Sequence, residues 1–91
     1  MTSTLRSLIY DAEAIAQEPN PRVTLGAVRA LGRDIEDTAP AVAAMAHGLL
    51  AAAANAAFDL VAGTHARSQG AARTTILRTM RRVAGLLRRA R

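Results

Sequence analysis

The chain has 91 residues, a length that suits one small domain, and its formal net charge is +5. All twelve basic residues are arginines, and the absence of cysteine excludes disulfides and thiolate metal sites. Hydrophobic residues make up 51% of the chain and recur at helical spacing, which excludes a disordered protein.

Residues 2–18 are predicted to form the first helix. Its apolar residues fall on one face at helical spacing, namely Leu5, Leu8, Ile9, Ala12, Ile15 and Ala16. Thr2, Ser3 or Thr4 can cap its start, and Pro19 disfavours helical backbone at the preceding residue. No compact apolar run with a small-residue cleavage site follows the first residues, so we expect no secretion signal. We therefore expect a cytoplasmic location, or one within a nucleoprotein or virion assembly.

Residues 21–38 are predicted to form the second helix. Asn20 is suited to the N-cap, and Pro21 is tolerated in a first turn, where its missing N–H is not needed. Val28, Leu31 and Ile35 give this helix one apolar side. Gly26 and Gly32 each cost up to about 1 kcal/mol relative to alanine, unless they allow a close helix crossing. The sequence leaves both interpretations open.

Residues 39–62 are predicted to form the third helix, which is apolar on most sides. Asp37 or Thr38 can cap its start, and Gly63 is suited to its end unless this helix continues into the next. Such a helix must be covered by others. The chain has few large apolar residues to do so, and we expect self-association. The predicted oligomer interface is the face formed by Val42, Met45, Leu49, Ala53, Ala56 and Leu60.

Residues 66–91 are predicted to form a basic amphipathic last helix. Its apolar side consists of Ala72, Ile76, Met80, Val83, Ala84 and Leu87. The opposite side carries what we call the Arg stripe, formed by Arg67, Arg78, Arg81, Arg82, Arg88 and Arg89. Residues 47–91 hold eight arginines against one acid, a net charge of +7, whereas residues 1–46 hold four against six, a net charge of −2. No acid follows Asp59.

These elements predict an all-α fold. It is a single helical domain over residues 1–91, a small bundle of about four helices (2–18, 21–38, 39–62 and 66–91) completed by oligomerisation. We expect no catalytic, cofactor or metal site. His47 and Asn55 are about 12 Å apart along the third helix, too far for one ion, and no nucleophile lies in a catalytic motif.

The Arg stripe predicts a polyanion partner. An ordinary solvated helix face mixes charges of both signs, whereas this one does not. Arginine forks suit phosphates, so nucleic acid bound without strong sequence preference is the first expectation. The only aromatic residues, Tyr10 and Phe58, are not interleaved with these arginines, which argues against base stacking. The third helix is nearly uncharged and does not suit a recognition helix.

Two alternatives remain for the same helix. A basic amphipathic helix also binds anionic membrane surfaces. The Arg stripe can instead meet an acidic protein surface, such as Asp11, Glu13 and Glu18 of another subunit, in a protein–protein assembly module.

In layout, the chain resembles filamentous-phage coat proteins. The shared features are an acidic amphipathic start, an apolar alanine-rich middle and a basic C-terminus. The resemblance implies a virion or nucleoprotein scaffold whose basic end faces packaged DNA. The chain departs from that layout in its length and in its breaks at Pro19, Pro21 and Pro40.

Overall fold

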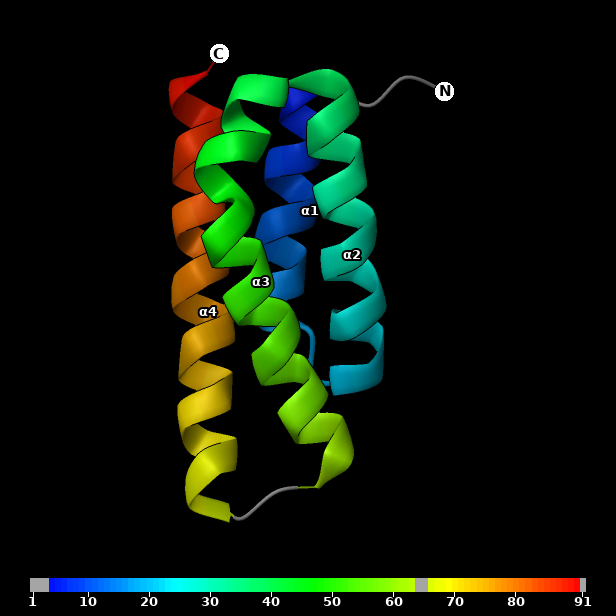
Figure 1. The fold of residues 1–91 in the computed structure, drawn as a ribbon, viewed down its shortest axis with the longest axis vertical. Coiled ribbons are helices and arrows are strands. Elements are labelled where there is room, and N and C mark those ends of the chain that lie inside the picture. The colour runs from blue at the N-terminus through cyan, green and yellow to red at the C-terminus, as the bar shows by residue number, and fades with distance from the viewer. Residues whose placement is uncertain (1–3, 64–65, 91) are drawn as a thin grey trace.

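The protein is an all-α bundle of four helices (Figure 1). The computed structural model describes residues 4–63 and 66–90, with side chains for 4–63 and 69–90. The helices are α1 (Leu5–Gln17), α2 (Pro21–Thr38), α3 (Pro40–Ala62) and α4 (Ala66–Arg89). The predicted fold class and the four predicted helices are confirmed, with ends that differ by at most three residues.

The helices alternate in direction, and each packs against two neighbours (Figure 1). α1 lies beside α2 and α4, and α3 also lies beside α2 and α4. The pairs α1–α3 and α2–α4 are therefore diagonal across the bundle. α3 and α4 are the longer helices, and they extend past the turn between α1 and α2 at the lower end of Figure 1.

Most predicted helix ends are confirmed. Thr4 caps α1 reciprocally with Ser7, because each side-chain oxygen accepts the other residue's backbone N–H at 3.0–3.1 Å. The Asn20 side chain accepts the Arg22 N–H at 3.0 Å at the start of α2. Gly63 ends α3 in the left-handed region, with φ of 72°, so α3 and α4 are not one continuous helix.

The start of α3 differs from the expectation. Ala39 is its N-cap and makes no side-chain capping hydrogen bond, so the expectation that Asp37 or Thr38 takes the N-cap position is wrong. Both residues belong to α2, which continues until the Ala39 N–H donates to the Ile35 carbonyl at 2.7 Å. A single residue thus separates the two helices, and Pro40 begins α3 without an N–H that needs a partner.

The core consists of the apolar sides predicted for α1, α2 and α4. Its members there include Leu8, Ile9, Ala12, Ile15, Val28, Leu31, Ile35, Ala72, Ile76, Met80, Val83, Ala84 and Leu87. α3 adds a thinner contribution, Val42, Ala46, Ala53, Ala56 and Ala57. The two buried threonines, Thr24 and Thr79, donate their hydroxyls to backbone carbonyls one turn earlier, which satisfies them inside the bundle.

The face predicted for oligomerisation lies largely inside this core. Val42, Ala53 and Ala56 are buried by the chain's own helices, whereas Leu49 and Leu60 are half-buried. Met45 is 60% exposed. The inward side of α3 is rotated from the predicted face toward Ala46 and Ala57. A second copy could therefore reach only part of the predicted interface, and self-association itself stays a prediction.

Candidate polyanion-binding surface

The outward side of α4 carries four exposed arginines, Arg78, Arg81, Arg82 and Arg89. Their position follows from helical spacing, because the large apolar residues of α4 point into the bundle and fix the orientation of the helix. Among the described side chains, no acid forms an ion pair with any of the four. We call these four residues the outer arginine face.

The other two members of the Arg stripe differ from these four. Arg88 forms an ion pair with Glu13 of α1, and both side chains remain about half exposed. The backbone of Arg67 belongs to the first turn of α4, and its side chain lies outside the described residues. The stripe predicted from sequence therefore divides into an unpaired outer face and one arginine that joins α4 to α1.

Arg73 has a structural role that sequence reasoning did not assign. Its guanidinium donates a hydrogen bond of 2.8 Å to the Pro19 carbonyl, in the turn between α1 and α2. This contact ties that turn to the side of α4. Nothing in the spacing of the arginines indicates the contact, because the two residues are far apart in sequence and meet only in the folded bundle.

The outer arginine face borders a groove between α3 and α4. The groove has a volume of about 480 Å³ and is lined by Met45, Leu49, Arg81, Arg82, Gly85, Leu86 and Arg89. Arg81 also lines the groove between α4 and α1, beside Glu13 and Gln17. Arg81 therefore lies on the outermost side of α4, between the two grooves. Arg82 and Arg89 lie on the side of α4 that faces α3.

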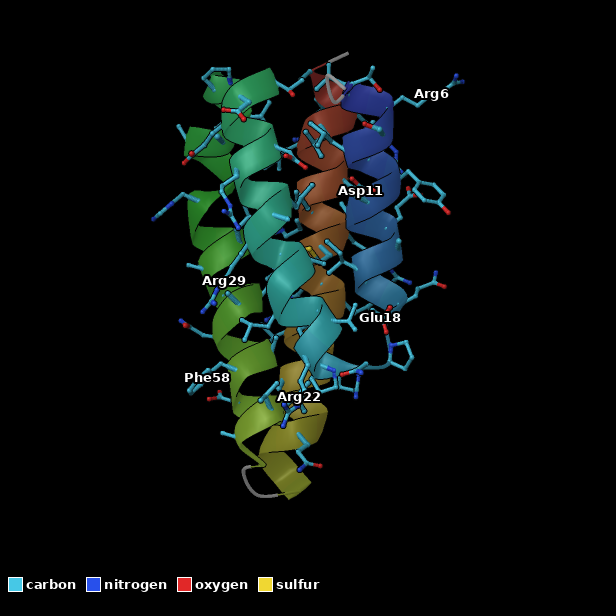
Figure 2. The ribbon with its side chains drawn as sticks, turned by 90° about the vertical axis from the view of Figure 1, so that its right-hand side faces the viewer. Arg6, Asp11, Glu18, Arg22, Arg29 and Phe58 are labelled. Atoms are coloured by element: carbon cyan, nitrogen blue, oxygen red, sulfur yellow. The ribbon has the colours of Figure 1, made fainter. Side chains whose placement is uncertain are left out.

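The α1–α2 side of the bundle differs from the outer arginine face in its mixed charge. Figure 2 shows Arg22 and Arg29 on α2 in the same view as Asp11 and Glu18. Arg29 and Arg33 of α2 line the groove between α2 and α3 together with Glu36. The groove between α3 and α4, by contrast, is lined by three arginines of α4 and by no acid.

No candidate metal site is found among the described residues. They contain no group of three or more histidine, aspartate or glutamate side chains arranged to hold an ion. His47 is exposed and lines the groove between α2 and α3, beside Arg29, Arg33 and Glu36. His65 lies outside the described residues.

α3 is the one described helix that is long and apolar enough to cross a membrane, judged by length and composition. Only 28% of its most apolar window is buried in the bundle. The rest of the helix is half-buried or exposed, and Met45 and Phe58 are its large exposed apolar side chains.

Comparisons of the chain with protein-family models, curated proteins and solved structures find no match. Function must therefore be inferred from the chemistry of the described surface.

Proposed function

We propose that this chain is a non-enzymatic protein that binds nucleic acid, chiefly duplex, through the outer arginine face of α4. The observation that carries the proposal is the presence of four exposed arginines on one helix side without an acidic partner among the described residues. Unpaired guanidinium groups repel one another at such spacing, and phosphates relieve that repulsion while accepting bidentate hydrogen bonds.

The dimensions of the face suit a duplex backbone. Arg78 and Arg89 are eleven residues apart, which on an α-helix corresponds to about 16 Å. A duplex rises by about 3.4 Å per base pair, so the face spans about five base pairs. Because these contacts are made to phosphates, they position the protein without reading the sequence.

The lack of nearby aromatic residues favours a duplex over a single strand. Tyr10 lies on α1 and Phe58 on α3, and neither lines the grooves beside the outer arginine face. Single-strand binding proteins usually stack bases on aromatic rings. The face therefore offers charge and hydrogen bonds but no stacking platform.

The buried side of α4 makes the membrane-surface alternative less favourable. A basic amphipathic helix binds a bilayer by inserting its apolar side below the headgroups. Here that side, including Ile76, Met80 and Leu87, is already packed in the core. Insertion would require the bundle to open, whereas phosphate binding uses α4 as it stands.

The test compares two triple variants that remove the same charge from opposite parts of the molecule. Arg78→Ala/Arg81→Ala/Arg82→Ala should weaken binding to short duplexes of unrelated sequence by more than about tenfold at low salt. The matched control, Arg22→Ala/Arg29→Ala/Arg33→Ala, removes three exposed arginines from α2 and should change affinity much less.

Fluorescence anisotropy with labelled duplexes measures both effects, and vesicles of anionic lipid serve as a second ligand. Equal losses in the two variants would show that net charge alone governs binding and would contradict the proposal. Tight binding to the vesicles with none to nucleic acid would favour the membrane alternative. If the chain bound neither ligand, the remaining explanation of the Arg stripe would be a protein–protein assembly module, in which it contacts an acidic protein surface.

A further inference from the structure

Two grooves of opposite charge lie on opposite sides of the bundle. α1 neighbours α2 and α4, and α3 also neighbours both, so the α1–α2 and α3–α4 grooves face away from each other. Each groove has an apolar floor between charged side chains. The charged side chains are all acidic in the first groove and all basic in the second.

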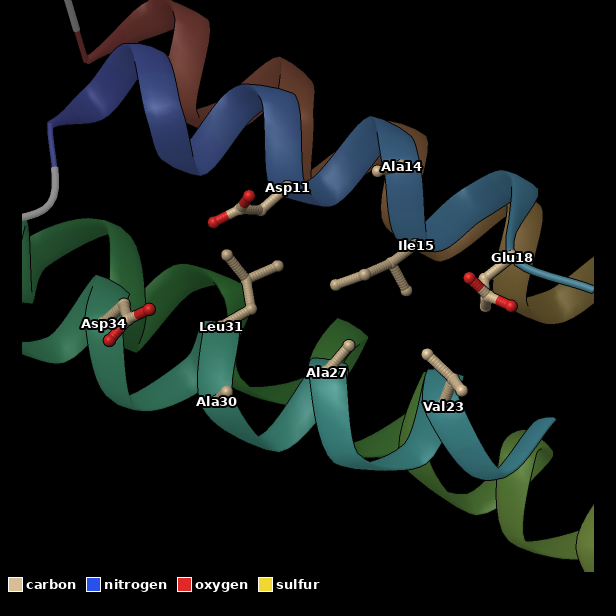
Figure 3. A pocket seen from close by; sticks show the side chains of 9 residues that line it. All are labelled: Asp11, Ala14, Ile15, Glu18, Val23, Ala27, Ala30, Leu31 and Asp34. Atoms are coloured by element: carbon tan, nitrogen blue, oxygen red, sulfur yellow. The ribbon is translucent and has the colours of Figure 1, made fainter. Parts of the chain in front are cut away.

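The α1–α2 groove is the acidic one. Its volume is about 260 Å³, and it is lined by Asp11, Ala14, Ile15, Glu18, Val23, Ala27, Ala30, Leu31 and Asp34. Figure 3 shows Asp11 and Asp34 projecting from the two helices on either side of Leu31, while Glu18 lies beyond Ile15 toward Val23. Val23 is 49% exposed, and no arginine lines the groove.

The α3–α4 groove is the basic one. Met45, Leu49 and Leu86 form its floor, and its three charged side chains are Arg81, Arg82 and Arg89. Met45 is 60% exposed, and no acid lines this groove. Val23 and Met45 are two of the four large hydrophobic side chains exposed in the described residues, and the two lie in opposite grooves.

We infer that the α1–α2 groove of one copy docks onto the α3–α4 groove of a second copy, head to tail. Three carboxylates then meet three guanidinium groups, and charge-assisted Arg–carboxylate bonds are among the stronger polar contacts. The same contact covers Val23 and Met45, removing both from water. Charge of one sign on each face also opposes docking of two identical faces, which fixes the orientation.

A head-to-tail contact does not end at two copies. Each junction leaves one acidic groove free at one end and one basic groove free at the other, so growth continues until a ring closes or a filament forms. Arg81, Arg82 and Arg89 belong to this contact, and the same three belong to the outer arginine face. One arginine does not hold a phosphate and a partner's carboxylate together, so duplex nucleic acid competes with docking.

The test is a mixing experiment with two variants, measured by analytical ultracentrifugation without nucleic acid. The first, Asp11→Arg/Asp34→Arg, disables the acidic groove and keeps the basic one. The second, Arg82→Gln/Arg89→Gln, disables the basic groove and keeps the acidic one. Each variant alone should be monomeric at concentrations where the wild type associates, and the two mixed should form a 1:1 dimer that grows no further.

The outcomes separate this inference from other modes of association. A wild type that stays monomeric up to millimolar concentration overturns it, and so does association of either variant alone at wild-type strength. A mixture that remains monomeric also overturns it. Arg29→Gln/Arg33→Gln, which removes the same charge from α2, should associate like the wild type. Circular dichroism checks each fold, and Asp11→Asn/Asp34→Asn replaces the first variant if its arginines prevent folding.

Failure of docking is distinguishable from failure of the proposed function. The inference requires no nucleic acid, so it stands if the chain binds none. The Asp11→Arg/Asp34→Arg variant keeps every arginine of the outer face and should still bind duplex while failing to self-associate. If this variant lost both duplex binding and self-association, the two activities would not reside in separate grooves, and the inference would be contradicted.

Discussion

α3 and α4 are neighbouring helices of nearly equal length that differ in what they expose. α4 buries large apolar residues such as Ile76 and Leu87 and exposes arginines, so its sequence pattern determines which side faces inward. α3 buries Ala53 and exposes Ala51, and the two residues are chemically the same. Its orientation is therefore set by contacts with other helices. The proposed nucleic-acid binding depends on α4 because, of these two helices, α4 is the one whose exposed side differs chemically from its buried side.

The largest expected effect tests the orientation of α3. Ala53→Glu places a carboxylate at a fully buried position, which should cost about 5 kcal/mol and unfold most of the protein. Ala51→Glu makes the same change on the exposed side of the same helix and should shift stability by less than about 0.5 kcal/mol. Thermal unfolding followed by circular dichroism compares them. Similar melting temperatures for the two variants would contradict the orientation of α3 described above, in which Ala53 faces the core and Ala51 faces outward.

A smaller difference in stability is expected between substitutions on the buried and the exposed side of α4. Met80 is fully buried, so Met80→Ala should destabilise the fold by about 2–4 kcal/mol. Arg82→Ala, on the exposed side, should leave the free energy of unfolding within about 0.5 kcal/mol of the wild type. Urea denaturation measures both. A large loss from Arg82→Ala would assign that arginine to the fold and weaken its assignment to binding.

The smallest pair of effects compares the two glycines on either side of the α3–α4 junction. Gly63 has a positive φ, so Gly63→Ala should destabilise by about 1 kcal/mol. Gly70 lies within α4 with open space around its added Cβ, so Gly70→Ala should stabilise by about 0.5–1 kcal/mol. In thermal unfolding, Gly63→Ala should lower the melting temperature and Gly70→Ala should raise it. Stabilisation by both would contradict the left-handed helix end at Gly63.

The sequence was sufficient for the helices because their breaks have strong local causes. Pro19, Pro21 and Pro40 restrict backbone conformation whatever surrounds them, and Gly63 readily takes the positive φ that ends a helix. The structure places helix ends at or beside each. The buried sides of α1, α2 and α4 were predictable for a similar reason, since large apolar residues recur at helical spacing.

What the sequence could not provide depends on tertiary contacts. α3 is apolar on most sides, so periodicity favoured a face that the structure shows to be partly buried in the chain itself. The ion pair of Arg88 with Glu13 and the hydrogen bond from Arg73 to Pro19 join helices that are remote in sequence. For the Arg stripe, helical spacing predicted which side of α4 is exposed, but it did not predict that Arg88 forms an ion pair with Glu13.

The salt dependence of duplex binding tests the central claim most directly. Four unpaired arginines that neutralise four phosphates predict a slope of log affinity against log salt of about −3.6. Arg78→Ala/Arg81→Ala/Arg82→Ala should flatten that slope by about 2.7 while the far-ultraviolet circular dichroism spectrum stays unchanged. A slope that this variant leaves unchanged, or no measurable binding by the wild type at low salt, would contradict the account.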